Sequence, residues 1–244
     1  MLLNIKKSLS SRETFGCSRT RFNVRDITHV GNAIIEHSEN NKDLKEIKKA
    51  INNAEDKNKK LYKINPKRYR VIVCDSEKDY LKETRYKDIG GGACIKWNKI
   101  ILITPSMQEH FKANGTLYHE INHIFFLEKA KSFRPMWYVE GIAFLNQKYY
   151  HPKTTWKRYL KSVNNIERYL AVKSNQYKNL EERNKFYILS YFCIKYLEKH
   201  YSINKLIDFI DKIPRPYNNS KFWQGFESYF KLSKRDLVKR SLNK

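Results

Sequence analysis

The feature that most constrains this chain is a His-Glu-x-x-His set within residues 116–126, a run that contains no Gly or Pro. Such a run is predicted to be helical. Residues four apart lie on one face of a helix, so His119 and His123 can present imidazole nitrogens to a single ion. Glu120 stands beside them, close enough to act on a water at the same place. The spacing therefore predicts a metal site of the kind found in zinc hydrolases.

Two histidines leave such a site one ligand short, because a catalytic zinc usually takes three protein ligands and keeps one position open for water. The best candidate for the third ligand is Glu140, which lies 17 positions after His123 on a second segment with helical apolar spacing, residues 136–145. Its neighbours are apolar, and a buried charge without a partner is costly. The alternative, a carboxylate on the helix surface, stays open at this stage.

The residues around Glu140 extend the pattern. Residues 135–143 read Pro-x-Trp-x-x-Glu-Gly-x-Ala and follow the His-Glu-x-x-His set. Together the two motifs resemble those of the gluzincin zinc metallopeptidases of the peptidase MA-like group. The resemblance implies one zinc ion held by His119, His123 and Glu140, with Glu120 as the general base.

The resemblance covers roughly residues 69–242 and is strongest at 116–145. Within it, Tyr187 resembles the family's catalytic tyrosine, whose hydroxyl would aid the oxyanion. The chain has 17 tyrosines, so a packing role for Tyr187 is the alternative. Gly92, Ala93 and Cys94 resemble the edge strand along which the family lays the substrate backbone.

The chain departs from the family at two places. Cys94-Ile95-Lys96 stands where aminopeptidases carry Met-Glu-Asn, so the glutamate that recognises a free amino terminus is missing. This difference favours an endopeptidase over a typical aminopeptidase. Phe144 stands where thermolysin-like enzymes carry an aspartate that orients a zinc histidine, so the sequence identifies no such partner for His119.

The order of the apolar patterns predicts an α+β fold. Helical spacing from residue 26 to about 61 predicts one or two amphipathic helices, with a break near Asn40-Asn41. Alternating and β-branched runs predict three strands. The first strand is expected to lead through a turn into a short helix near residues 79–84. The strands are expected at residues 69–74, 93–97 and 99–104, the last two as a tight hairpin or a pair of edge strands.

Every later segment shows helical spacing, over residues 159–172, 184–200, 203–213, 222–230 and 233–242. The expected fold is thus an N-terminal helix and small mixed β-sheet packed on the motif helix, followed by a mostly α-helical, zincin-like C-terminal half. Residues 1–24 are expected to form a flexible basic arm. Residues 25–244 are expected to form one metallopeptidase domain, with subdomains at 25–128 and 129–244.

The chain has 49 Lys and Arg against 25 Asp and Glu, a net charge of +24. This excess is spread over the whole chain rather than gathered in one stripe, so a solvated basic surface explains it better than a nucleic-acid interface. The four cysteines lack Cys-x-x-Cys spacing, which favours buried thiols in a reducing compartment. The sequence shows neither a secretory signal nor an apolar run of membrane-spanning length, which favours a cytoplasmic protein.

These patterns predict a zinc-dependent metallopeptidase that hydrolyses bonds of a peptide or protein substrate with a metal-activated water. The alternative is a non-catalytic zinc-containing protein whose basic surface contacts nucleic acid or an acidic partner. Glu120 counts against this alternative, because a purely structural zinc site needs no general base. A peptidase with one narrow protein target is a further alternative.

Overall fold

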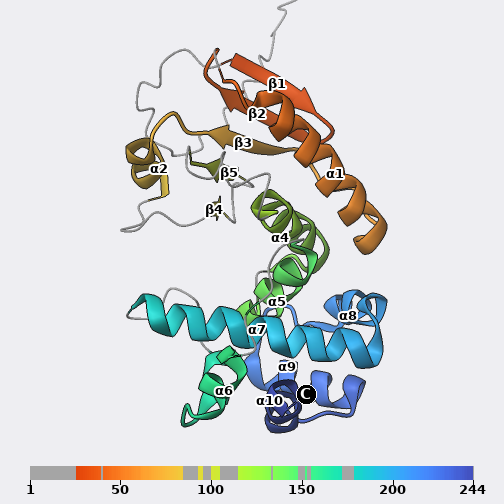
Figure 1. The fold of residues 1–244 in the computed structure, drawn as a ribbon. Coiled ribbons are helices and arrows are strands. Elements are labelled where there is room, and N and C mark those ends of the chain that lie inside the picture. Colours follow the sequence, from red (N-terminus) through yellow and green to blue (C-terminus); the bar gives the residue numbers. More distant parts are fainter. Residues whose placement is uncertain are drawn as a thin grey trace, which may run out of the picture.

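The computed structural model describes residues 26–39, 41–84, 93–95, 100–104, 115–132, 134–147, 152, 155–171 and 179–243. They form an α+β fold with a β-sheet at one end, a mostly helical half at the other, and the helices α4 and α5 between them (Figure 1). The expected fold class is confirmed. The expected arm of residues 1–24 lies outside the described residues.

The described part of the chain begins with a β-hairpin, where the sequence pattern predicted a helix. Strand β1 (Asp26–Val30) pairs antiparallel with β2 (Ala33–His37), and the pairing of Val30 with Ala33 leaves a two-residue turn. Gly31 in that turn has a φ of +55°, a conformation that glycine adopts without strain. The helix prediction for this segment is wrong, because two short strands joined by Gly-Asn place apolar residues at spacings that also fit a helix.

Three further strands complete the sheet, which has the order β1-β2-β3-β5-β4. They are β3 (Tyr69–Val73), β4 (Ala93–Ile95) and β5 (Ile100–Ile103). Strand β3 is parallel to both β2 and β5, whereas β4 pairs antiparallel with β5. The expected pairing of the last two strands is therefore confirmed, and β4 is an edge strand among those that the structure describes.

The two faces of the sheet are covered by different helices. Val71 and Val73 belong to the main core, which also includes residues of helices α1 (Leu44–Tyr62) and α4 (Thr116–Ala130). On the other face, Ile72 and Leu102 pack with Tyr80 of helix α2 (Glu77–Thr84). The β-branched runs that predicted β3 and β5 thus supply the side chains that are buried on the two faces of the sheet.

The motif helix α4 lies in the centre of the protein and is buried along almost its whole length. It begins after Gly115 and ends before Lys131, two residues with left-handed backbone conformations. It packs against α1 and against helix α5 (Met136–Asn146), which is also almost entirely buried. Helices that are apolar nearly all round belong in a protein interior. The expected subdomain boundary after residue 128 falls within the last turn of α4.

The C-terminal half is helical, as expected, and its long helix α7 packs on α5 (Figure 1). The segment predicted as one helix over residues 159–172 is instead two short pieces. Asn165 between them has a φ of 52°, which ends one helical run before the next begins. The elements are α6 (Thr155–Lys161), the 3-10 helix η1 (Ile166–Leu170), α7 (Leu180–Tyr201), α8 (Ile203–Phe209), the 3-10 helix η3 (Ile210–Lys212), α9 (Asn219–Phe230) and α10 (Lys234–Asn243).

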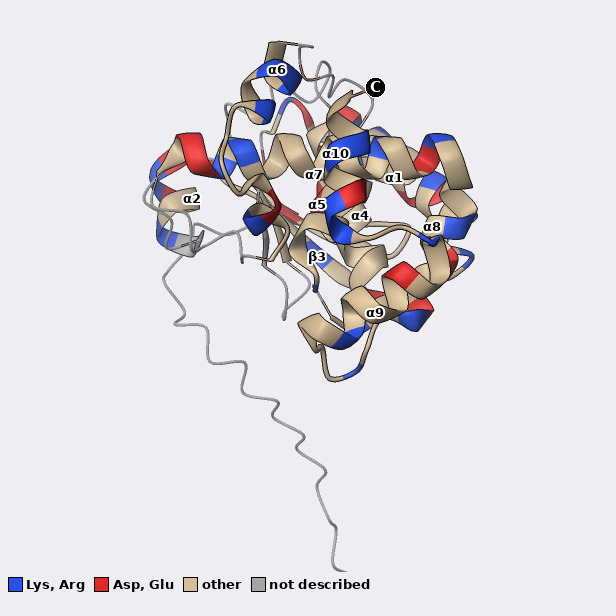
Figure 2. Ribbon diagram, turned by 90° about the horizontal axis from the view of Figure 1, so that it is seen from below, with Lys and Arg blue, Asp and Glu red and all other residues tan. Residues whose placement is uncertain are grey.

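Surface and thiol features bear on the class of protein. In the part of the chain that the structure describes, no helix is both long and apolar enough to cross a membrane. Cys74 and Cys193 are buried and form no disulfide, as predicted, whereas Cys17 lies outside the described residues. Basic and acidic residues occur together on helices such as α2 and α8 (Figure 2), so the described residues form no single positive stripe on this face.

Candidate metal centre

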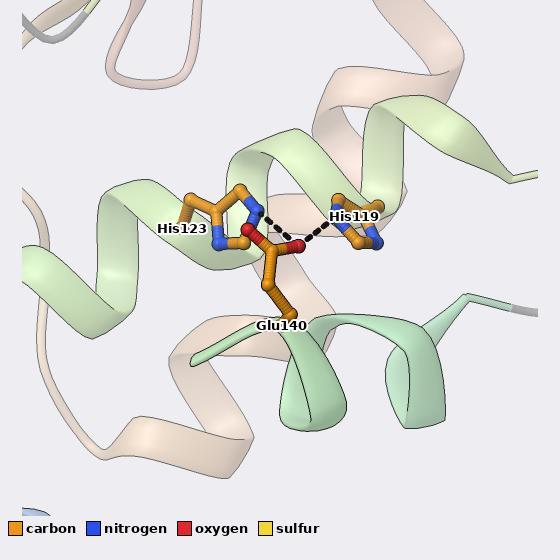
Figure 3. Close-up of side chains that lie close together, drawn as sticks. All are labelled: His119, His123 and Glu140. Carbon is orange, nitrogen blue, oxygen red and sulfur yellow. Dashed lines mark hydrogen bonds and ion pairs between the residues drawn. The ribbon is translucent and has the colours of Figure 1, made fainter. Parts of the chain in front are cut away.

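Helix α4 presents His119 and His123 on one face, one turn apart (Figure 3). Their ring centroids are 4.6 Å apart, and the ring planes are nearly perpendicular, at 89°. Both side chains are buried in the centre of the protein. The four-residue spacing therefore does what the sequence predicted, because the helix turns both imidazoles toward the same point.

Helix α5 brings the carboxylate of Glu140 to that point (Figure 3). Its Oε2 lies 3.2 Å from Nε2 of His119 and 3.5 Å from Nε2 of His123. One ligand atom from each of the three residues lies within 4.8 Å of the other two. Glu140 is buried, so it is not a surface carboxylate. The crossing of α4 and α5 thus assembles a three-residue donor set.

The three side chains are electrostatically coupled. Burial alone would lower the pKa of His119, but the hydrogen bond to Glu140 and the charges of Glu120 and Glu140 raise it overall. Burial alone would raise the pKa of Glu140, but the charge of His123 and hydrogen bonds from both histidines hold it below its ordinary value. The anionic form of Glu140 is therefore favoured in the interior, and an anionic carboxylate is the form that binds a divalent cation.

The donor set fits a zinc ion of the catalytic type. Two imidazole nitrogens and one carboxylate oxygen are a known ligand set for catalytic zinc, and they leave one coordination position for water. The two Nε2 atoms both lie close to the same oxygen of Glu140, so the three candidate ligand atoms point toward one position. The buried His-His-Glu set could therefore hold a metal ion, and the identity of that ion stays a prediction.

Glu120 is the next residue along α4 after His119. It is 7% exposed, close to the 6% of His119 and the 5% of His123, whereas Ile121 on another face of the helix is fully buried. All of these side chains are therefore buried in the interior of the protein. The charge of Glu120 also acts on the His119 ring. The structure thus places a buried carboxylate beside the donor set, on the same helix as both histidines.

Tyr187 is separated from His119 by one aromatic ring, that of Phe144. Its ring centroid is 5.5 Å from that of Phe144, whose own centroid is 4.5 Å from that of His119. Tyr187 is half-buried on α7. The structure thus brings the sequence-predicted tyrosine to the neighbourhood of the donor set.

The expected substrate strand is partly described. Ala93 and Cys94 belong to β4, which pairs with β5 through one edge and lies beside α4. Gly92 lies outside the described residues. Among the strands described, β4 is terminal in the sheet order, so its second edge offers backbone donors and acceptors next to the motif helix.

Sequence reasoning missed several residues around the centre. Phe144 packs its ring on His119, and the nearby amide of Gln147 also raises the pKa of that histidine. Asn122, inside the motif, is fully buried and hydrogen-bonded to Asn58 of α1. An asparagine in a strongly apolar helix was a signal that could have indicated a buried polar contact.

No protein-family model matches this chain, and no curated protein or solved structure matches it significantly. Relatives therefore assign it neither a family nor an activity. The resemblance to gluzincins rests on the motif residues, and what the centre can do follows from its own geometry.

Proposed function

We propose that this chain is a zinc-dependent metallopeptidase that cleaves internal peptide bonds. The observation that supports this proposal most directly is the convergence of His119, His123 and Glu140. These three polar side chains come from two helices that are otherwise largely apolar and buried. Three buried polar groups gathered at one point cost stability unless they serve a purpose. Holding one metal ion is the purpose that best fits their chemistry.

His119, His123 and Glu140 would hold one zinc ion. When bound, the ion would supply Lewis-acid chemistry, lowering the pKa of a water and polarising the scissile carbonyl. The hydrogen bond between His119 and Glu140 orients both side chains before any ion arrives. Since the ligand atoms already converge, little rearrangement is needed for binding.

Glu120 would be the general base. A carboxylate oxygen of Glu120 accepts the proton of the attacking water and then delivers it to the nitrogen of the leaving amine. This role needs a carboxylate that lies next to the three candidate ligands and is not itself one of them. Glu120 meets both conditions, because it follows His119 on α4 and does not belong to the converging triad.

Two further elements would act on the substrate. The hydroxyl of Tyr187 would donate a hydrogen bond to the developing oxyanion. The outer edge of β4 would pair with the substrate backbone as an added strand, which holds an extended peptide beside α4. The chain lacks a Met-Glu-Asn motif at residues 94–96, so recognition of a free amino terminus is not expected.

The test combines metal analysis with cleavage. Wild-type protein should bind one equivalent of zinc and generate new peptide termini in a mixture of cellular proteins. Glu120→Gln should keep the zinc and lose cleavage, whereas Glu128→Gln, a control at the end of the same helix beside Lys131, should keep both. The absence of stoichiometric zinc in the wild type contradicts the proposal. Zinc binding with a salt-dependent nucleic-acid shift and no cleavage would favour the binding-protein alternative.

A further inference from the structure

Three buried asparagines form a cluster where α1 meets the two helices that carry the donor set. Asn58 belongs to α1, Asn122 to α4 and Asn146 to the last turn of α5. Asn58 and Asn122 are fully buried, and Asn146 is nearly so. Buried amides are costly unless they are hydrogen-bonded, so the contacts that they make determine whether the cluster has a role.

The oxygen of Asn58 joins the two helices. Its Oδ1 accepts a hydrogen bond from Nδ2 of Asn122 at 3.0 Å and another from Nδ2 of Asn146 at 2.9 Å. Its own Nδ2 donates to the carbonyl oxygen of Ala54 at 2.9 Å, which fixes the orientation of the amide. One atom on α1 therefore holds α4 and α5 at the same time.

Neighbouring contacts reinforce this bridge from the same helix. Tyr62 donates from its hydroxyl to Oδ1 of Asn122 at 3.0 Å. Lys57 donates from Nζ to the backbone carbonyl oxygen of Asn146 at 2.8 Å. A buried network whose members are partnered favours one arrangement of the helices over others, which a purely apolar contact does less well.

The bridge is placed where it can control the donor set. Asn122 lies between the two histidines in the sequence, about 60° around the helix axis from His119. Asn146 lies on the same helix as Glu140, two turns or less toward its C-terminus. A shift or rotation of α4 against α5 would move the histidine nitrogens away from the carboxylate. Metal sites tolerate only about 0.5 Å of such misplacement.

We propose that Asn58 is a positioning residue that fixes α4 against α5 and thereby sets the zinc affinity of the centre. This inference rests on the proposed metal centre. It extends the site to a third helix, α1, which contributes no ligand. The bridge acts through Asn122 and Asn146. Its loss therefore changes the relative positions of His119, His123 and Glu140 without removing any of these ligands.

The experiment separates positioning from ordinary stability. Asn58→Leu keeps the branched arrangement of side-chain heavy atoms and removes the shared acceptor, whereas Asn58→Asp keeps an acceptor oxygen for both amide donors. Ile51→Ala, a buried residue on the same helix, is the control that weakens packing without touching the bridge. Zinc affinity is measured by competition with a chromophoric chelator, and ligand geometry by the absorption spectrum of the cobalt-substituted protein.

Asn58→Leu is expected to bind zinc about 10- to 100-fold more weakly, as is typical when a residue that supports metal ligands is lost. Its cobalt spectrum should change, and Asn58→Asp should restore both readouts toward wild type. Ile51→Ala should lower the unfolding temperature and leave zinc affinity and the cobalt spectrum as in wild type. An Asn58→Leu protein with wild-type affinity and an unchanged spectrum would overturn the inference.

A second variant keeps the test decisive if Asn58→Leu does not fold. Asn146→Leu removes the amide contact between Asn58 and α5, leaves the contact between Asn58 and Asn122, and should weaken zinc binding in the same direction. Wild-type protein that takes up no zinc overturns the metal centre itself. Wild-type zinc binding together with unaltered affinity in Asn146→Leu overturns only the role of the bridge.

Discussion

A Cβ atom at Gly141 would lie 2.6 Å from the backbone carbonyl oxygen of Ser190. It would also lie 2.3 Å from a side-chain carbon of Ile194, so α5 meets α7 at a distance that only glycine allows. Gly141 directly follows Glu140 in the chain. The contact that holds α5 on α7 therefore also determines where the ligand carboxylate lies.

We predict that Gly141→Ala lowers the free energy of unfolding by about 1–3 kcal/mol, because the added methyl group is forced against backbone that cannot move aside. The matched control is Gly225→Ala on α9, where an added Cβ meets no atom within 4 Å. That substitution should be neutral or stabilising by up to about 1 kcal/mol, as expected for alanine in a helix. Urea unfolding of both proteins measures the difference, and equal effects would contradict the close contact.

Removal of the metal should lower thermal stability. An ion that binds only the folded chain stabilises it by about 2.7 kcal/mol at a free concentration of 100 times Kd. For a chain of this size that corresponds to an increase of roughly 5–10 °C in Tm. Differential scanning calorimetry with zinc and with a chelator measures the shift. Glu140→Ala removes one ligand and should show little response to either, and a full zinc response in that variant would contradict its role.

Tyr187→Phe tests the proposed oxyanion contact. The substitution keeps the ring that packs on Phe144 and removes only the hydroxyl. We expect kcat to fall about 10²- to 10³-fold, with zinc content and Tm close to wild type. Tyr191→Phe, one turn further along α7, is the matched control and should retain activity. Equal turnover in both variants would assign Tyr187 a packing role.

The first turn of α7 should contribute a pH-dependent part of the stability. Hydrogen bonds from Lys185 and Tyr169 lower the pKa of Glu182 below its ordinary value of 4.5. A carboxyl group whose pKa is lower in the folded state stabilises the protein above its unfolded-state pKa, and that contribution is lost as the pH falls through the folded value. The side chain is partly exposed, so the contribution should not exceed about 1 kcal/mol.

Urea unfolding from about pH 6 to about pH 3 measures this contribution. Glu182→Gln should lose less stability on acidification than the wild type, because the glutamine has no charge to lose. Glu227→Gln, at an exposed position on α9, should follow the wild-type curve. A Glu182→Gln curve parallel to that of the wild type would show that the ion pair is energetically silent.

Local pattern was sufficient for the long helices and the central strands. The β-branched runs of β3 and β5 indicate strands, and the three- and four-residue spacing of Ile47, Ile51 and Ala54 on α1 indicates a helix. The hairpin of β1 and β2 was missed because its strands are short. In such segments the backbone conformation of Gly31, rather than apolar spacing, decides the structure.

The sequence by itself determined the chemistry of the donor set and the placement of His119 and His123 on one helical face, because residues four apart always share a face. It named Glu140 as a candidate and left its position open. Tertiary structure decided that the carboxylate meets the histidines, through the close contact at Gly141 and the amide bridge at Asn58. These are contacts between segments far apart in the chain, and local periodicity carries no information on how such segments cross.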